Sequence, residues 1–336
     1  MIGFIAKNRC KSYTCALFLA LGLLQLPSYV QAAQDFTTIQ SMAEQGDVTA
    51  QFNLGLLYFK GEGVAQDAKQ ALFWFRQAAE QGQVNAQAVL GNLYSKGEGV
   101  AQDDKQAVIW YRKAAEQGNA DCQFLLGDSY STGTGVAQDA KQALFWFRQA
   151  AEQGQANAQA VLGNRYASGE GVAQDDKQAV AWYRKAAEQG HAFAQLILGG
   201  SYADGKGVAQ DDKQAVAWYR KAAEQGNALA QFSLGFSYTH GKGVAQDDKQ
   251  AVAWYRKAAE QGNALAQSHL GSFYFQGRGL SQDNSHAYVW LSVAVANGRV
   301  DATELRDLAA KKLSNGQLEV SQRLAGQYFE KYQPLR

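Results

Sequence analysis

The sequence repeats with a period of 36 residues over most of the chain, from residue 47 to residue 298. All seven tryptophans keep this spacing, from Trp74 to Trp290, and so does a series of glycines from Gly46 to Gly298. The segment AQDDKQAVAWYRKAAEQGNALAQ occurs unchanged at 209–231 and at 245–267. A fixed period of this length is typical of proteins built from stacked supersecondary units. Seven units fill residues 47–298, and each is expected to bury its apolar surface against its neighbours.

Each unit is predicted to form two helices joined by a glycine turn. In the first unit a helix covers about residues 48–60, with Gly55 placed where another helix must come close. The second helix opens after Asp67, whose carboxylate can accept the free amide hydrogens of the first turn. Apolar residues then recur at the spacing that one helical face collects: Ala71, Trp74, Phe75, Ala78 and Ala79.

The segments outside the repeats are organised differently. Residues 1–32 are typical of an export signal, because Lys7, Arg9 and Lys11 precede an apolar run too short to cross a bilayer comfortably. We place cleavage after Ala32, and an uncleaved anchor is the alternative. Residues 33–46 are predicted to form an N-terminal capping helix. Residues 299–336 are predicted to form C-terminal capping helices, with Gln317 positioned for a capping box.

The repeat has a specific pattern of residues. In one unit it comprises Ala230-Gln231, Leu234-Gly235, Tyr238, Gly241, Gly243-Val244, Asp247, Ala251, Trp254-Tyr255 and Ala258-Ala259. The pattern resembles the Sel-one-like repeat (SLR), a relative of the tetratricopeptide repeat, and covers all seven units. The resemblance implies an all-α, right-handed superhelical solenoid of seven 36-residue helical hairpins with helical caps. We expect the tryptophans to be structural residues of its core: Trp74, Trp110, Trp146, Trp182, Trp218, Trp254 and Trp290.

The copies differ mainly on one side of the first helix. The resemblance implies that this variable side lines the concave groove of the solenoid. It is polar in the first four units and more apolar and aromatic in the last three, as a groove for a protein segment would be. The candidate partner-binding residues are Asn85, Asn92, Asp121, Asp128, Asn157, Asn164, Phe193, Ile197, Leu229, Phe236, His240 and His269. Alternatively, the differences reflect drift after duplication, and Phe52, Phe124 and Phe232 pack against the adjacent hairpin.

Several kinds of chemistry lack support in the sequence. The four histidines have no acidic or cysteine partners at metal-ligand spacing, and we predict no metal, cofactor or catalytic residue. Cys122 is the one cysteine after the proposed signal and takes a position held by alanine in the other units. Some exported SLR proteins have been described as β-lactamase-like or penicillin-binding, but their paired cysteines and a Ser-x-x-Lys sequence are absent here. Charges of both signs are interspersed and form no basic stripe, which argues against binding of nucleic acid.

We therefore predict an exported, non-enzymatic scaffold or adaptor of the bacterial cell envelope. It would bind segments of other envelope or secreted proteins in the concave groove, as a monomer without a membrane span after signal cleavage. The periplasm is the expected location, and secretion is the alternative. An immunity or inhibitor protein that sequesters a secreted toxin is the second functional hypothesis, and a β-lactamase-like or penicillin-binding SLR protein is the third.

Overall fold

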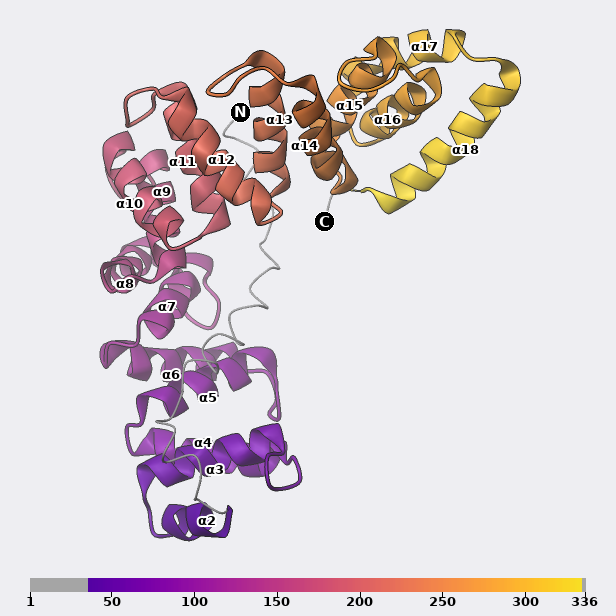
Figure 1. Ribbon diagram of the computed structural model, residues 1–336. Helices are drawn as coiled ribbons and strands as arrows, with labels where there is room; N and C mark the ends of the chain where they lie inside the picture. Colours follow the sequence, from indigo (N-terminus) through magenta and orange to yellow (C-terminus); the bar gives the residue numbers. More distant parts are fainter. Residues whose placement is uncertain (1–35, 334–336) are drawn as a thin grey trace. The chain divides into compact units, whose positions relative to one another are not determined.

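The chain is all-helical wherever its fold is described, as the periodicity predicts. The computed structural model describes residues 36–333, and in that range it contains no strand (Figure 1). The proposed export signal lies outside the described residues. Two compact units divide the chain, one ending at Ala150 and the other beginning at Ala151.

Consecutive helices pair as hairpins in both units. The first unit holds α2 (Phe36–Glu44), α3 (Val48–Lys60), α4 (Ala68–Glu80), α5 (Val84–Lys96), α6 (Asp104–Glu116), α7 (Ala120–Thr132) and most of α8 (Ala140–Glu152). The second unit continues with α9 (Ala156–Ser168), α10 (Asp176–Glu188), α11 (Ala192–Asp204), α12 (Asp212–Glu224), α13 (Ala228–His240), α14 (Asp248–Glu260), α15 (Ala264–Gln276), α16 (Asn284–Ala296), η2 (Val300–Ala302), α17 (Thr303–Lys311) and α18 (Asn315–Lys331).

The residues that we predicted to begin and end helices do so in the structure. The Asp175 carboxylate caps α10 by accepting from the backbone amides of Lys177 and Gln178, at 2.9 and 3.0 Å. Gly61 ends α3 in the left-handed region, at φ 73°. Ser314 and Gln317 form the capping box expected at the start of α18. None of the helices within 36–333 is long and apolar enough to cross a membrane.

In six of the seven hairpins an aromatic ring packs on a glycine of the first helix, and in the last one Leu291 takes that place on Gly271. In α14 the Tyr255 side chain is completely buried, and a Cβ atom on Gly235 of α13 would lie only 2.8 Å from its ring. The same contact joins Gly163 of α9 to Tyr183 of α10. These glycines therefore allow the two helices of a hairpin to approach closely, as predicted for Gly55.

The tryptophans are less central to the core than we expected. Trp110 and Trp290 are buried, but the other five are only half-buried. Trp182 is covered from outside by Lys185, whose Nζ lies 4.1 Å from the centre of the indole ring. The fully packed ring is that of the next residue, Tyr183, because this position faces the glycine of the first helix.

Buried glutamines join each hairpin to the one before it. Gln231 of α13 is 4% exposed and donates to the Ala223 carbonyl of α12 at 3.1 Å. Its Oε1 accepts from Gln261 at the end of α14, at 2.8 Å. A buried amide with both ends bonded fixes the register between neighbouring hairpins. The same arrangement holds in other repeats for Gln51 with Gln81, Gln87 with Gln117, Gln159 with Gln189 and Gln195 with Gln225.

An arginine–tyrosine contact adds a second link between hairpins. Arg220 of α12 donates to the Tyr238 hydroxyl of α13 at 2.8 Å. The equivalent pairs are Arg76 with Tyr94, Arg112 with Tyr130, Arg184 with Tyr202 and Arg256 with Tyr274. The constant residues of the repeat therefore serve mainly to stack one hairpin on the next.

Candidate partner-binding surface

Three of the predicted groove residues meet in one cluster in the second unit. We define the aromatic–histidine cluster as Phe232, Phe236 and His240 of α13, Tyr255 of α14 and His269 of α15. The His269 ring stacks on Tyr255, with centroids 5.0 Å apart, and lies 5.5 Å from Phe232. Phe236 lies 4.0 Å from the His240 ring. The first helices of two successive repeats thus bring their variable residues together.

The cluster has a buried base and an accessible rim. Tyr255 forms the base, and its hydroxyl hydrogen-bonds Thr239 at 3.0 Å. Burial raises the pKa of Tyr255 to about 12, so this residue stays neutral. Phe236 and His269 are partly exposed and His240 is exposed. The rim therefore offers aromatic surface and ring nitrogens to another molecule.

Cationic side chains surround this rim. Lys242 places its Nζ 5.8 Å from the centre of the Phe236 ring. Arg299 pairs with Asp301 at 2.5 Å, and both act electrostatically on His269. The pKa of His269 is lowered, first by burial and then by the nearby charges of Arg299 and His240. At neutral pH the imidazole is therefore uncharged and able both to donate and to accept a hydrogen bond.

Other predicted groove residues have partners inside the fold. Asn92 accepts from the Tyr111 hydroxyl at 3.0 Å, and Asn164 accepts from the Tyr183 hydroxyl at 2.7 Å. Asn157 contacts His191 at 3.2 Å. These contacts give part of the sequence variation a structural reason, because Asn92 and Asn164 each accept from a tyrosine hydroxyl of the second helix.

The remaining candidates are spread along the first helices. Ile197 packs against the core of the second unit, and the Phe193 ring lies edge-on to His191. Leu229 is 50% exposed and lies on α13 with the cluster. Asn85, Asp121 and Asp128 are exposed in the first unit. The alternative interpretation packed three phenylalanines against the adjacent hairpin, but the ring contacts of Phe52 with Phe75, Phe124 with Phe147 and Phe232 with Tyr255 lie within one hairpin. Phe232 also contacts His269 of the next hairpin.

His191 makes the start of α11 sensitive to pH. Its Nδ1 accepts from the backbone amide of Ala194 at 3.2 Å, so the cap requires a neutral ring with its proton on Nε2. Burial lowers the pKa of His191. The equivalent caps of the other first helices are an aspartate, two glutamines and three asparagines, such as Asn227, which accepts from Ala230 at 2.9 Å.

We predict that the free energy of unfolding falls as the pH drops below about 6.5, where the unfolded histidine takes up a proton that the folded one resists. His191→Asn should match the parent at pH 7.5 and lose less stability at pH 5.5, in urea denaturation at both values. His240→Asn, at an exposed histidine, is the control. If the parent and His191→Asn lost the same unfolding free energy between pH 7.5 and pH 5.5, the assignment of this pH dependence to His191 would be contradicted.

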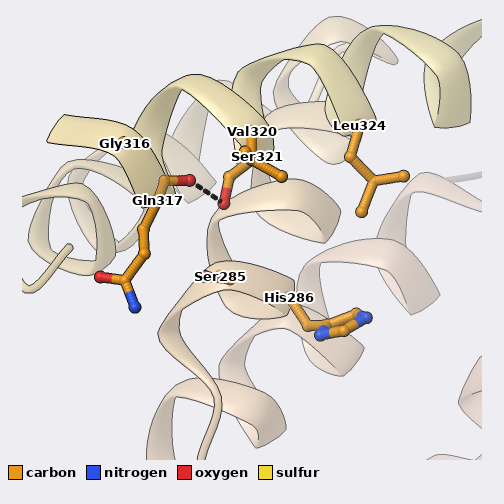
Figure 2. A pocket seen from close by; sticks show the side chains of 7 residues that line it. All are labelled: Ser285, His286, Gly316, Gln317, Val320, Ser321 and Leu324. Carbon is orange, nitrogen blue, oxygen red and sulfur yellow. Dashed lines mark hydrogen bonds between the residues drawn. The ribbon is translucent and has the colours of Figure 1, made fainter. Parts of the chain in front are cut away.

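A cleft of about 420 Å³ lies between α16 and α18 (Figure 2). Its walls carry Ser285 and His286 on one side and Gly316, Gln317, Val320, Ser321 and Leu324 on the other. Ser321 donates to the Gln317 carbonyl of its own helix at 2.8 Å, and His286 pairs with Asp283 at 2.7 Å. These polar groups are engaged locally and do not converge on the cleft. Among residues 36–333, no group of three or more His, Cys, Asp and Glu could hold a metal ion.

The fold and its inter-hairpin contacts define a solenoid of consecutive helix pairs. The Sel1 repeat family model matches seven segments without interruption, covering residues 48–298. The chain therefore belongs to the Sel1 repeat family. Proteins of this family are in general non-enzymatic scaffolds for protein–protein interaction.

Several solved structures of bacterial proteins are similar to this chain. A Sel1 repeat protein from Oxalobacter formigenes is 36% identical over 83% of each chain, with a TM-score of 0.65. A protective antigen of uropathogenic Escherichia coli strains, which displays an SLR fold, is 31% identical, with a TM-score of 0.46; the match covers 89% of this chain and 95% of the antigen. An immunity protein from Pseudomonas aeruginosa is 22% identical over 63% of this chain and 80% of its own, with a TM-score of 0.38. No curated protein matches the chain.

Proposed function

We propose that this protein is an exported adaptor of the bacterial cell envelope that binds segments of partner proteins. The aromatic–histidine cluster is the observation that carries the proposal. Four of its rings come from the variable first helices of two repeats and rest on Tyr255 of α14, and part of their surface is left accessible. Aromatic side chains beside neutral polar groups are enriched in protein interfaces, where a few such residues dominate the binding energy.

Export is proposed from the features of residues 1–32 and places the partners in the periplasm, with secretion as the alternative. The aromatic rim and Lys242 favour a partner segment with an apolar side chain next to a carboxylate. Phe193 and Ile197 of α11, the first helix of the preceding repeat, and Leu229 of α13 would extend this contact.

The test is a pull-down from periplasmic extract with the exported protein and a paired variant, Phe236→Ala/His240→Ala. We expect the variant to retain its melting temperature, because both side chains are partly or fully exposed, and to lose about tenfold or more of the captured partner. Leu308→Ala/Val320→Ala, at exposed apolar residues of the C-terminal helices, is the matched control. The mass of the exported chain, expected to begin at Ala33, tests the signal in the same preparation.

Retention of every captured protein by Phe236→Ala/His240→Ala would overturn the assignment of the cluster. Capture of a single toxin, together with poisoning of cells from which the protein is deleted, would instead support the immunity hypothesis.

A further inference from the structure

The His269 ring of the aromatic–histidine cluster is held in place by other rings and not by hydrogen bonds. It stacks on Tyr255 with an angle of 20° between the ring planes, and Phe232 lies 5.5 Å away. Among residues 36–333 no group hydrogen-bonds either of its ring nitrogens, and neither nitrogen is fully buried. The imidazole is therefore fixed in orientation and has its hydrogen-bonding capacity free for a ligand.

The charges around His269 favour an anionic ligand. Arg299 and Asp301 act on His269 from the segment after α16, and His240 acts on it from α13. Lys242, in the loop after α13, lies beside the aromatic rim of the cluster. The fixed charges among these groups are two positive and one negative, which leaves a net charge of one positive. An anion that approaches the rim is therefore attracted.

A cationic ligand is the alternative for a site made of aromatic rings, because the face of an aromatic ring attracts cations. Two contacts oppose it here. The Nζ atom of Lys242 already lies 5.8 Å from the centre of the Phe236 ring. The carboxylate of Asp301 is engaged by Arg299 at 2.5 Å. A second cation would meet the charge of Lys242 without a free carboxylate from Asp301 to balance it.

The charge of the His269 ring depends on what it contacts. Burial is the main cause that lowers its pKa, followed by the charges of Arg299 and His240, while Asp301 acts in the opposite direction. Tyr255, on which the ring stacks, stays neutral. At pH 7.5 the imidazole is therefore uncharged. A carboxylate within about 4–6 Å would favour the protonated ring. Binding of an anion and uptake of a proton at His269 must then strengthen each other.

We propose that the cluster binds a carboxylate of the partner segment on the His269 ring, beside an apolar side chain, and that this ring takes up a proton on binding. This assignment rests on the proposed function, and it adds the group that recognises the partner and the condition that controls affinity. The carboxylate accepts a hydrogen bond from a ring nitrogen, and the apolar side chain packs against Phe236. A fall in pH therefore strengthens binding, and a rise in pH releases the partner.

The test uses 3-phenylpropionate as the probe, because it joins one aromatic ring to one carboxylate, and 3-phenylpropanamide as its uncharged counterpart. Binding to the exported protein is followed at pH 7.5 and 5.5 by NMR of ¹³C-labelled histidine rings. The chain has four histidines, so single substitutions assign the signals. We expect the affinity for 3-phenylpropionate to be about three- to tenfold higher at pH 5.5, where carboxylates are still largely ionised. The probe should also move the midpoint of the His269 titration to higher pH, and the amide should bind equally at both values.

Three variants separate the causes. His269→Phe keeps a ring on Tyr255 that cannot take up a proton, so its affinity for the probe should not depend on pH. Lys242→Gln removes a charge that is constant over this range, and it should weaken binding by a similar factor at both values. His286→Gln is the matched control, because it removes a histidine outside the cluster and introduces the residue that the other repeats have at this position. It should behave like the parent.

Three results would each overturn this assignment: equal affinity of the parent for 3-phenylpropionate at both pH values, no binding at either, or a pH dependence that persists in His269→Phe. The periplasmic pull-down separates it from the proposed function. A partner that the parent captures equally at pH 7.5 and 5.5, and that Phe236→Ala/His240→Ala loses, would leave the adaptor function standing and overturn only the link to proton uptake.

Discussion

Tyr183→Ala is expected to lower the free energy of unfolding by about 3–5 kcal/mol, the usual range for truncating a buried aromatic. The Tyr183 ring is 4% exposed, packs on Gly163 and hydrogen-bonds Asn164. Its neighbour Trp182 is only half-buried, so Trp182→Ala should cost less, about 1–2 kcal/mol. Urea denaturation followed by circular dichroism compares the two variants within one helix. A larger loss for Trp182→Ala would show that the tryptophan is the core residue after all.

Gln195→Leu is expected to cost about 1–3 kcal/mol although it makes the side chain more apolar. Gln195 donates to the Ala187 carbonyl at 3.0 Å and accepts from Gln225 at 2.7 Å. Leucine would remove both hydrogen bonds, each with a net contribution of about 0.5–1.5 kcal/mol. The Ala187 carbonyl keeps the Gly190 amide as a donor, and the exposed Gln225 amide keeps the Gly190 carbonyl as an acceptor.

The matched control for this prediction is Gln214→Leu, on the exposed side of α12, which should change stability by less than about 0.5 kcal/mol. The double variant Gln195→Leu/Gln225→Leu should lose less than the sum of the two single variants, because both single variants remove the same hydrogen bond. Equal stabilities of Gln195→Leu and Gln214→Leu would show that the glutamine contacts do not hold the hairpins together.

The period and the cap chemistry were sufficient to predict the hairpins. The first helix, expected over about residues 48–60, is observed as Val48–Lys60, because Asp47 and Gly61 delimit it by local hydrogen bonding and backbone conformation. The position of Gly55 also indicated the close approach of two helices, and the structure places the Phe75 ring there.

Packing between helices was harder to predict. Trp182 and Tyr183 both belong to the apolar side of one helix, and only the contact with Gly163, twenty residues away, makes the second of them the core ring. The partners of each buried glutamine lie eight residues before it and thirty residues after it in the chain. A helical-wheel argument treats each helix alone and cannot find such partners.

The residues of the candidate site were likewise predicted only in part. Phe236, His240 and His269 were selected because they vary between copies, and the structure brings them together. Tyr255 was missed because it is a constant residue of the second helix that also forms the base of the cluster.

The central claim is that partner segments bind at the aromatic–histidine cluster. Its most direct test is site-specific photo-crosslinking in living cells, with benzoylphenylalanine replacing Phe236 in one strain and Gln214 in another. The account predicts a light-dependent adduct with a second protein from position 236 and none from position 214. Adducts from position 214 alone, or from neither position while the parent still captures a partner, would contradict it.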